Sequence, residues 1–333
     1  MTHSATDGML QEWGTRLFHG MPKKAKQHGA GGALAFMSAG NVRAQLRAAV
    51  RPSAKQVMVK ITGGGRGMKA VAAHFRYISR LGKPEVGGKG QSLELEDENG
   101  DKVAGKEAIE GLQYDWRMAG SFIPDESHRR EVFNIVLSMP EGTPADRVRD
   151  AARAFARETF EGHKYVFALH DDTGSPHVHL AVRAERMDGV RLNPRKADLQ
   201  RWRERFAARL QDRGINAVAT RASARGMARA PKQLWRVRAG EEGRVRTPRP
   251  AMRSEASVKV ARSQAIEAWG RIATALAESS ESQDHDLARE IVRYVGQQFG
   301  KAAPEQSVQR IDSLSKSIES SRPRNQKDRD QDR

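Results

Sequence analysis

The sequence predicts an α+β fold of layered α/β type: helices pack on a central, mainly antiparallel sheet, and a helical C-terminal extension follows. Three observations predict this class. Strand-like and helix-like segments follow one another between residues 56 and 213. Two apolar segments of that stretch are joined by a short turn, which makes them neighbouring antiparallel strands. Amphipathic helical patterns return after residue 256.

The spacing of apolar side chains predicts each element in turn. Alternation of Val57, Val59 and Ile61 predicts a strand over Gln56–Thr62, and a helical pattern follows over Met68–Leu81. Residues 85–105 are expected to form a polar excursion. The next elements are expected in the order helix, strand, helix, strand, strand, helix: Lys106–Met118, Val132–Met139, a helix that opens at Thr143-Pro144, Tyr165–His170, His177–Arg183 and Ala197–Arg213.

Changes in composition predict five regions along the chain. Residues 1–50 hold short basic and glycine-rich stretches and are expected to form a basic N-terminal arm. The layered domain spans residues 51–232, and an arginine-rich linker follows over residues 233–256. Residues 257–316 form a helical region, with amphipathic helices over Ser257–Leu276 and Ala288–Phe299. Residues 317–333 are too polar to pack and are expected to be disordered.

The composition indicates a protein that binds polyanions. Across 333 residues, 58 Lys and Arg outnumber 41 Asp and Glu, which gives a net charge of +17. No apolar run approaches the roughly 20 residues of a spanning helix, so no membrane insertion is expected. The N-terminus lacks a signal-peptide core, which indicates the cytoplasm. The absence of cysteine leaves His and carboxylates as the available metal ligands.

A cluster of histidines carries the main chemical prediction. His170, His177 and His179 lie within ten residues of one another, although the chain has only ten histidines. Side chains alternate across a strand, so His177 and His179 project from one face, and the short connection lets His170 reach the same point. Three converging imidazoles with Asp172 nearby outline a metal site. The alternative is three ordinary polar side chains on an exposed sheet face.

A cation on a basic protein suggests phosphodiester chemistry, and the nucleophile is the next question. Water would give a nuclease, whereas a side-chain hydroxyl would give a reversible covalent intermediate. Tyr77 lies beside Arg76 and Arg80, whose charges favour phosphate binding; the alternative is a packing residue of its helix. Tyr114 is the reserve candidate. Tyr165 has the wrong strand parity to face the histidines.

Three sequence blocks resemble DNA relaxases of the His-hydrophobic-His (HUH) superfamily, which nick and transfer strands in plasmid conjugation and mobilisation. They are HDDTGSPHVH (His170–His179), FRYISRLG (Phe75–Gly82) and VFNIVLSMPEGT (Val132–Thr143). The likeness is to the class that contains the T-DNA border endonuclease and the relaxases of broad-host-range conjugative plasmids, and it covers roughly residues 56–232. Two features depart from that class: Ser175 stands where some relatives carry a further His, and the arm before Gln56 is unusually long.

The resemblance implies a metal-dependent, HUH-relaxase-like transesterase. Tyr77 would be the nucleophile, which attacks single-stranded DNA and leaves a 5′-phosphotyrosyl link. His170, His177 and His179 would hold the cation, and Asp172 would orient a histidine or help to take the phenol proton. Resemblance implies Mg or Mn, whereas imidazole ligands suit Zn or Mn, so the identity of the ion stays open.

The resemblance also implies partners. The DNA would be the nick site of an origin of transfer (oriT), and relaxosome accessory proteins would assist. A coupling protein and a type IV secretion system would receive the product, and the polar C-terminal tail could help to present the protein to that channel.

Several basic residues and one serine are expected to contact DNA. Resemblance places Ser138 near the nick. The segment Gly63–Gly67 is either a flexible turn or a loop that, with Arg66, grips phosphate. The full DNA-binding set is Ser138, Arg66, Arg76, Arg80, Arg201 and Arg205, the last two on an arginine-rich helix whose charges could instead form a solvated face.

Three other functions are compatible with the sequence. A rolling-circle replication initiator of the same superfamily would use the same chemistry at a replication origin. A non-catalytic basic DNA-binding protein would leave the histidines without a role. A zinc hydrolase is the weakest alternative, because the sequence has no His-Glu-x-x-His motif.

Overall fold

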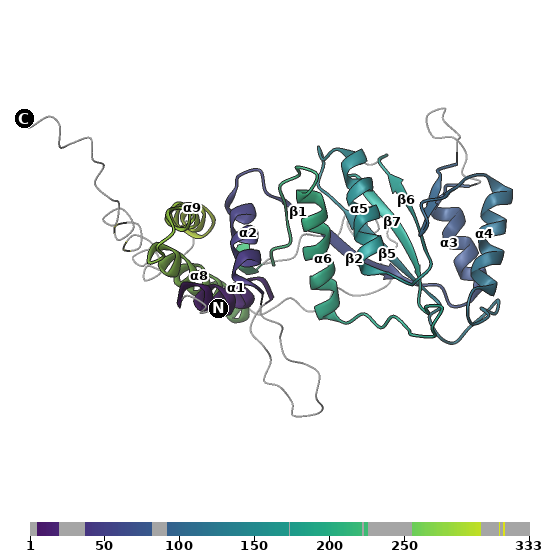
Figure 1. Ribbon diagram of the computed structural model, residues 1–333, viewed down its shortest axis with the longest axis horizontal. Coiled ribbons are helices and arrows are strands. Elements are labelled where there is room, and N and C mark those ends of the chain that lie inside the picture. The colour runs from purple at the N-terminus through teal and green to yellow at the C-terminus, as the bar shows by residue number, and fades with distance from the viewer. Residues whose placement is uncertain are drawn as a thin grey trace, which may run out of the picture. The chain divides into compact units, whose positions relative to one another are not determined.

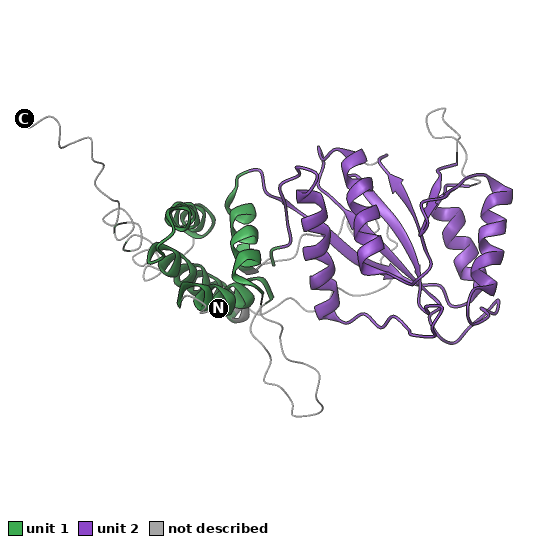
Figure 2. Cartoon of the chain, in the orientation of Figure 1, with its two compact units in different colours: residues 1–52, 220–333 green, residues 53–219 purple. Residues whose placement is uncertain are grey.

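The computed structural model describes residues 5–19, 37–81, 92–172, 174–221, 223–225 and 255–300, together with residues 313 and 316. The chain divides into two compact units (Figure 2). Unit 2 comprises residues 53–219, and unit 1 comprises residues 1–52 and 220–333. Most of the expected basic linker and the expected disordered tail lie outside the described residues, and the predicted domain limits remain predictions.

Unit 2 is an α+β layer structure built on a six-stranded antiparallel sheet, which confirms the predicted fold class (Figure 1). The strand order is β2-β5-β7-β6-β3-β4. The strands are β2 (Met58–Gly63), β3 (Leu95–Asp97), β4 (Lys102–Val103), β5 (Val132–Ser138), β6 (Tyr165–His170) and β7 (His177–Arg183). A second, two-stranded sheet pairs β1 (Lys55–Gln56) with β8 (Ala217–Val218) in parallel.

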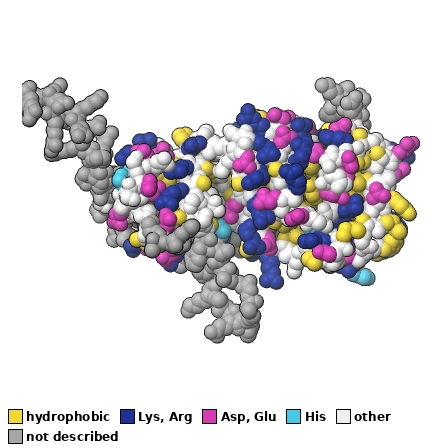
Figure 3. Space-filling model, in the orientation of Figure 1, with side chains coloured by type: hydrophobic (Ala, Val, Ile, Leu, Met, Phe, Trp, Pro, Cys, Tyr) yellow, Lys and Arg dark blue, Asp and Glu magenta, His cyan; other side chains and the backbone are white. Residues whose placement is uncertain are grey.

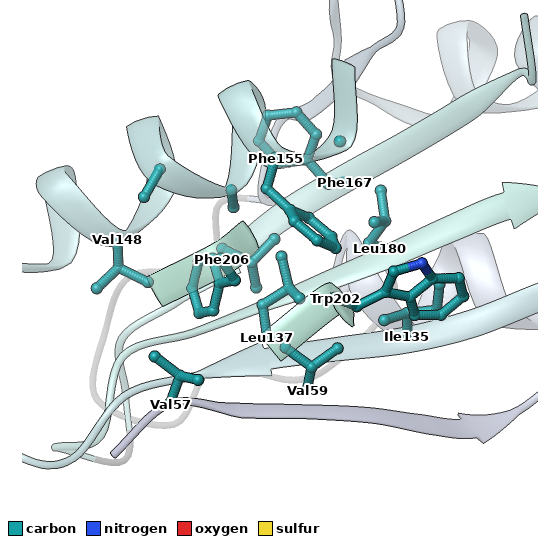
Figure 4. Packing of buried hydrophobic residues seen from close by; sticks show 14 of the residues in the cluster. Val57, Val59, Ile135, Leu137, Val148, Phe155, Phe167, Leu180, Trp202 and Phe206 are labelled. Carbon is teal, nitrogen blue, oxygen red and sulfur yellow. The ribbon is translucent and has the colours of Figure 1, made fainter. Parts of the chain in front are cut away.

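Two helical layers cover the opposite faces of the large sheet. Helices α5 (Ala145–Thr159) and α6 (Lys196–Gln211) pack on one face, where Phe155, Phe206 and Trp202 meet the sheet (Figure 4). Helices α3 (Met68–Ile78) and α4 (Lys106–Met118) pack on the other face through a separate buried cluster. Strand parity therefore decides which layer each side chain of the sheet meets.

The α3 layer is fixed by aromatic packing. Phe75 and Trp116 are fully buried and meet edge to face, with 4.9 Å between their ring centroids. Val166, Ala168 and Ala181 supply the sheet side of this cluster. This packing holds the C-terminal end of α3 over strands β6 and β7.

Unit 1 is helical and joins the two ends of the chain. It contains α1 (Ala5–His19), α2 (Ala39–Val50), the short η1 (Ser223–Arg225), α8 (Glu255–Ala277) and α9 (Ser282–Phe299). Helix α1 packs on α2 and α8, and α9 packs on α2 and α8. Residues 1–50, expected to form an arm, thus contribute two packed helices. Among the described helices, none has the length and apolar character that crossing a membrane requires.

Candidate active site

The β6–β7 hairpin brings the three predicted histidines together. His170 ends β6 and His177 begins β7, and the two residues are cross-strand partners. His179 follows two positions later and therefore projects from the same face. Gly174 in the connecting loop has φ 72°, a conformation that glycine adopts at little cost. A tight turn and strand alternation thus suffice to build the cluster.

The imidazole nitrogens converge as a metal site requires. One nitrogen from each of His170, His177 and His179 lies within 4.8 Å of the other two. The ring centroids are 4.5 to 5.4 Å apart. His170 and His179 are buried, and His177 is half-buried. The cluster lies on the face that α3 and α4 cover, at the end of the hairpin where the loop joins β6 to β7.

Backbone hydrogen bonds assign the ring nitrogens. Nε2 of His170 lies 2.8 Å from the carbonyl oxygen of Ile78, and Nδ1 of His177 lies 3.0 Å from that of Ser175. A carbonyl only accepts, so these two nitrogens must carry hydrogens. The lone pairs of His170 Nδ1 and His177 Nε2 are then the ones that face a cation. Carbonyl partners of this kind orient metal-ligating histidines.

Burial keeps the rings of His170 and His179 in the neutral form that metal binding needs. It lowers the pKa of His179 to about 3 and also lowers the pKa of His170. Neutral imidazoles are ligands that a borderline divalent ion such as zinc accepts. Therefore, the residues present fit a divalent cation, and the identity of the ion stays open.

Tyr77 reaches the histidine cluster from the last turn of α3. Its ring centroid lies 5.4 Å from that of His179 and 6.4 Å from that of His170. The side chain is 49% exposed, so an incoming substrate can approach it. The structure therefore brings the predicted nucleophile and the predicted metal ligands into one centre.

The other tyrosines occupy different surroundings. Tyr165 belongs to the core under α5 and α6, as strand parity predicted, and burial raises its pKa to about 12. Tyr114 lies on α4 and is 65% exposed. Tyr294 is in unit 1, where its ring lies 5.3 Å from that of Trp269. Tyr77 is the tyrosine whose ring meets the histidines within the described part of the chain.

Asp172 and Arg80 form an ion pair beside the cluster. The Arg80 guanidinium lies 2.5 Å from the Asp172 carboxylate and 3.4 Å from Nδ1 of His170. The hydrogen bond from Arg80 holds the pKa of Asp172 below its usual value, which makes this carboxylate a weak base. Asp172 was expected to orient a histidine or to help take the phenol proton. In the structure it holds Arg80, while backbone carbonyls hold His170 and His177.

Ser138 lies next to the cluster in the sheet. It ends β5 and is the cross-strand partner of His177, so both side chains project from the same face. The serine is half-buried and stands between His177 and Met58 of the neighbouring strand. Its predicted contact with DNA remains a prediction, and its position beside the histidines is compatible with it.

His74 is a further imidazole that the sequence analysis did not single out. It lies one turn before Tyr77 on α3, and the two rings stack with centroids 6.1 Å apart. Its Nε2 is buried and has no hydrogen-bond partner among the described residues. Burial lowers the pKa of His74 to about 4, so the ring is neutral at physiological pH. The sequence could have indicated this contact, because His74 precedes Tyr77 by three positions and residues at this spacing are neighbours on a helix.

The predicted DNA-binding arginines divide between the two faces of the sheet. Arg76 and Arg80 lie on or just after α3, on the histidine side. Arg201 and Arg205 lie on α6, which covers the opposite face, where Lys and Arg gather together with acidic side chains (Figure 3). There Arg201 pairs with Asp198, and Arg205 lies 3.6 Å from Glu158. The structure does not bring these two arginines to the histidine cluster.

The glycine segment before α3 is closely packed. A Cβ on Gly64 would lie 2.3 Å from the carbonyl oxygen of Val132, and the amide of Gly65 already donates to that oxygen. Arg66 is exposed and donates to the carbonyl of His128. Close backbone approach therefore explains at least one of these glycines, and a grip on phosphate by Arg66 remains a prediction.

Comparisons with known proteins agree with this geometry. The sequence model of the family described as "Relaxase: MobA/VirD2-like, nuclease domain" matches residues 94–215. The T-DNA border endonuclease VirD2 of Rhizobium radiobacter is 26% identical over 199 residues, which are 54% of this chain and 45% of that relative. The VirD2 of Agrobacterium fabrum is 26% identical over 198 residues, which are 54% of this chain and 43% of that relative.

The fold, the histidine centre and these matches define the class of this domain. The chain carries a relaxase nuclease domain, and that domain is of the MobA/VirD2-like class. The family match includes Ser138, Asp172 and the three histidines, and it begins after Tyr77. The matched part of the chain covers less than half the length of either relative.

Proposed function

We propose that this chain is a DNA relaxase that nicks one strand at an origin of transfer by tyrosine transesterification. The observation that carries the proposal is the meeting of Tyr77 with the histidine cluster, at 5.4 Å between the ring centroids of Tyr77 and His179. A nucleophile and a metal centre on one open face are what phosphoryl transfer from DNA to a side chain requires.

The reaction conserves the number of phosphodiester bonds. The phenolic oxygen of Tyr77 attacks the phosphorus, the bond to the 3′-oxygen breaks, and a 5′-phosphotyrosyl link forms. The phenol proton passes to water at this exposed residue, and the departing 3′-oxygen takes a proton from water. Because the tyrosyl ester retains the energy of the broken bond, a 3′-hydroxyl can later attack it and rejoin the strand.

The residues around Tyr77 would hold and orient the phosphate. His170, His177 and His179 would hold a divalent cation, which when bound supplies Lewis-acid stabilisation of the phosphate oxygens. Arg80 donates from the turn that carries Tyr77, and Ser138 offers a hydroxyl beside His177. Asp172 would act by positioning Arg80 rather than as the base, because its pKa is lowered.

The biological setting that fits this chemistry is conjugation or plasmid mobilisation. Two relatives are named as border endonucleases, which supports a substrate of single-stranded DNA cut at a defined site. We propose the cytoplasm as the compartment, and relaxosome accessory proteins, a coupling protein and a type IV secretion system as partners. A replication initiator with the same centre would instead cut DNA from a replication origin.

The proposal is tested by covalent capture of an oriT oligonucleotide. Wild-type protein with Mn²⁺ or Mg²⁺ should give a protein–DNA adduct that survives on a denaturing gel, and EDTA should abolish it. Tyr77→Phe should form no adduct because it lacks the attacking oxygen, and it should still bind the DNA. Tyr114→Phe is the matched control and should form the adduct normally. An adduct that persists in Tyr77→Phe would overturn the assignment.

A further inference from the structure

Arg80 occupies a backbone conformation that normally belongs to glycine. It follows the end of α3 with φ 57°, the one non-glycine residue with positive φ within the described ranges. The amide of Arg80 donates to Tyr77 and the amide of Leu81 donates to Arg76, the pattern of a Schellman helix end. Glycine would fit this position at lower cost. A strained arginine beside a catalytic centre indicates that its side chain is used there.

The side chain contacts the nitrogen that a cation would need. Nη2 of Arg80 lies 3.4 Å from Nδ1 of His170, and Nε2 of the same ring is committed to the carbonyl of Ile78. Arginine only donates, so Nδ1 must be the acceptor. Its lone pair is therefore already engaged by the guanidinium.

The guanidinium is incompletely satisfied in this position. One Nη donates to Asp172 at 2.5 Å, whereas Nε is buried and has no hydrogen-bond partner among the described residues. A buried donor without a partner costs free energy. The contact with His170 is also long for a hydrogen bond to nitrogen. These features indicate that Arg80 can give up its contact with His170 at little cost in free energy.

We infer that Arg80 is a placeholder for the metal ion: its guanidinium engages Nδ1 of His170 and must leave this nitrogen before a cation can bind it. A guanidinium and a divalent cation cannot share one lone pair, and their charges repel each other. The inference rests on the proposed function and deepens it. The phosphate contact proposed for Arg80 requires the same release, so cation binding and DNA binding would favour each other.

The test is calorimetric titration of Mn²⁺ into the full-length protein without DNA. Arg80→Gly suits the backbone conformation and removes the guanidinium, so its thermal stability should equal or exceed that of wild type. Its affinity for Mn²⁺ should be at least about tenfold higher than that of wild type, within the usual range of coupling between sites. Arg76→Met removes an exposed charge one turn earlier on α3 and should leave the Mn²⁺ affinity as in wild type.

The possible results separate this inference from the proposed function. If Arg80→Gly and wild type bind Mn²⁺ equally, or if Arg80→Gly binds more weakly, Arg80 is no placeholder and the metal centre stands. If Arg76→Met strengthens binding as much as Arg80→Gly, the effect is one of general charge and the inference is overturned. If neither wild type nor variant binds Mn²⁺ or Zn²⁺, the metal centre falls and the inference falls with it.

Discussion

His74 lies beside the three candidate metal ligands but is not one of them. Its burial opposes protonation of the ring. The ring is packed against Tyr77, and its Nε2 has neither solvent nor a described partner. Burial lowers its pKa from the ordinary 6.5 to about 4. The folded state therefore takes up this proton less readily than the unfolded state does.

This shift predicts a loss of stability in mild acid. Above pH 6.5 the ring is neutral in both states, so its titration costs nothing. As the pH falls from 6.5 towards 4, the unfolded state gains the proton first, and the free energy of unfolding should fall by about 2 kcal/mol by pH 5 from this group alone. Urea unfolding at pH 7.5 and pH 5 should show a smaller loss for His74→Gln. An identical loss in both proteins would contradict the account.

At the residue scale, the sequence predicted those contacts of the candidate site that depend on local geometry. Strand alternation and a short turn were enough for His170, His177 and His179, and resemblance supplied Tyr77. The contact of Arg80 with His170 could not be predicted, because it joins residues 90 positions apart through the packing of α3. The packing of α3 also creates the hydrogen bond between His170 and the carbonyl of Ile78 and the ion pair between Asp172 and Arg80. These contacts could not be predicted for the same reason.

At the scale of elements, the placement of Tyr77 depends on where α3 begins. Gly67 is the N-cap of α3, with φ 93°, and a Cβ there would lie 2.3 Å from the carbonyl oxygen of Asp125. The amide of Met68 donates to the carbonyl of Pro124 just beside it. The chain can enter the helix here only because this position lacks a side chain.

Gly67→Ala should therefore destabilise unit 2 by about 2 kcal/mol or more, because it combines a positive φ with a clash against backbone. Gly63→Ala is the matched control: a Cβ on Gly63 meets nothing within 4 Å. That variant should stay within about 1 kcal/mol of wild type. Denaturant unfolding of both variants measures the difference. Equal stability of the two would show that the entry to α3 is not tightly held.

The sequence predicted the long elements well and missed two short ones. The strands Tyr165–His170 and His177–Arg183 and the helix Lys106–Met118 were predicted with their observed limits. The strands β3 and β4 lie where a polar excursion was expected. They have three and two residues, too few for an alternating pattern, and the buried Glu96 of β3 pairs with Arg153 of α5 and Lys102 of β4.

At the scale of the whole molecule, unit 1 is held together by charges from both ends of the chain. Arg43 of α2 donates to Asp284 of α9 at 2.7 Å and to Asp7 of α1 at 2.8 Å. Asp284 is 1% exposed, and the pair lies 241 positions apart in sequence. Local patterns carry no information about such a contact, which is why the N-terminal residues were predicted as an arm.

Arg43→Met should destabilise unit 1 by about 3 kcal/mol, because it leaves a buried carboxylate without its cation. Arg47→Met is the control, since Arg47 donates a hydrogen bond to the neutral Gln283 and influences Asp284 through its charge. Hydrogen exchange read by mass spectrometry should show faster exchange in α2 and α9 of Arg43→Met, with β5 and β7 unchanged. Unchanged protection in α9 would contradict the assigned role of the ion pair.

The central claim is that Tyr77 and the three histidines form one reactive centre, and mapping the covalent adduct tests it most directly. The protein is reacted with an oriT oligonucleotide, digested with protease and nuclease, and the nucleotide-bearing peptide is sequenced by mass spectrometry. The account predicts that the residual nucleotide is attached to Tyr77. Attachment to Tyr114 or another residue, or cleavage of the strand with no attached nucleotide, would contradict it.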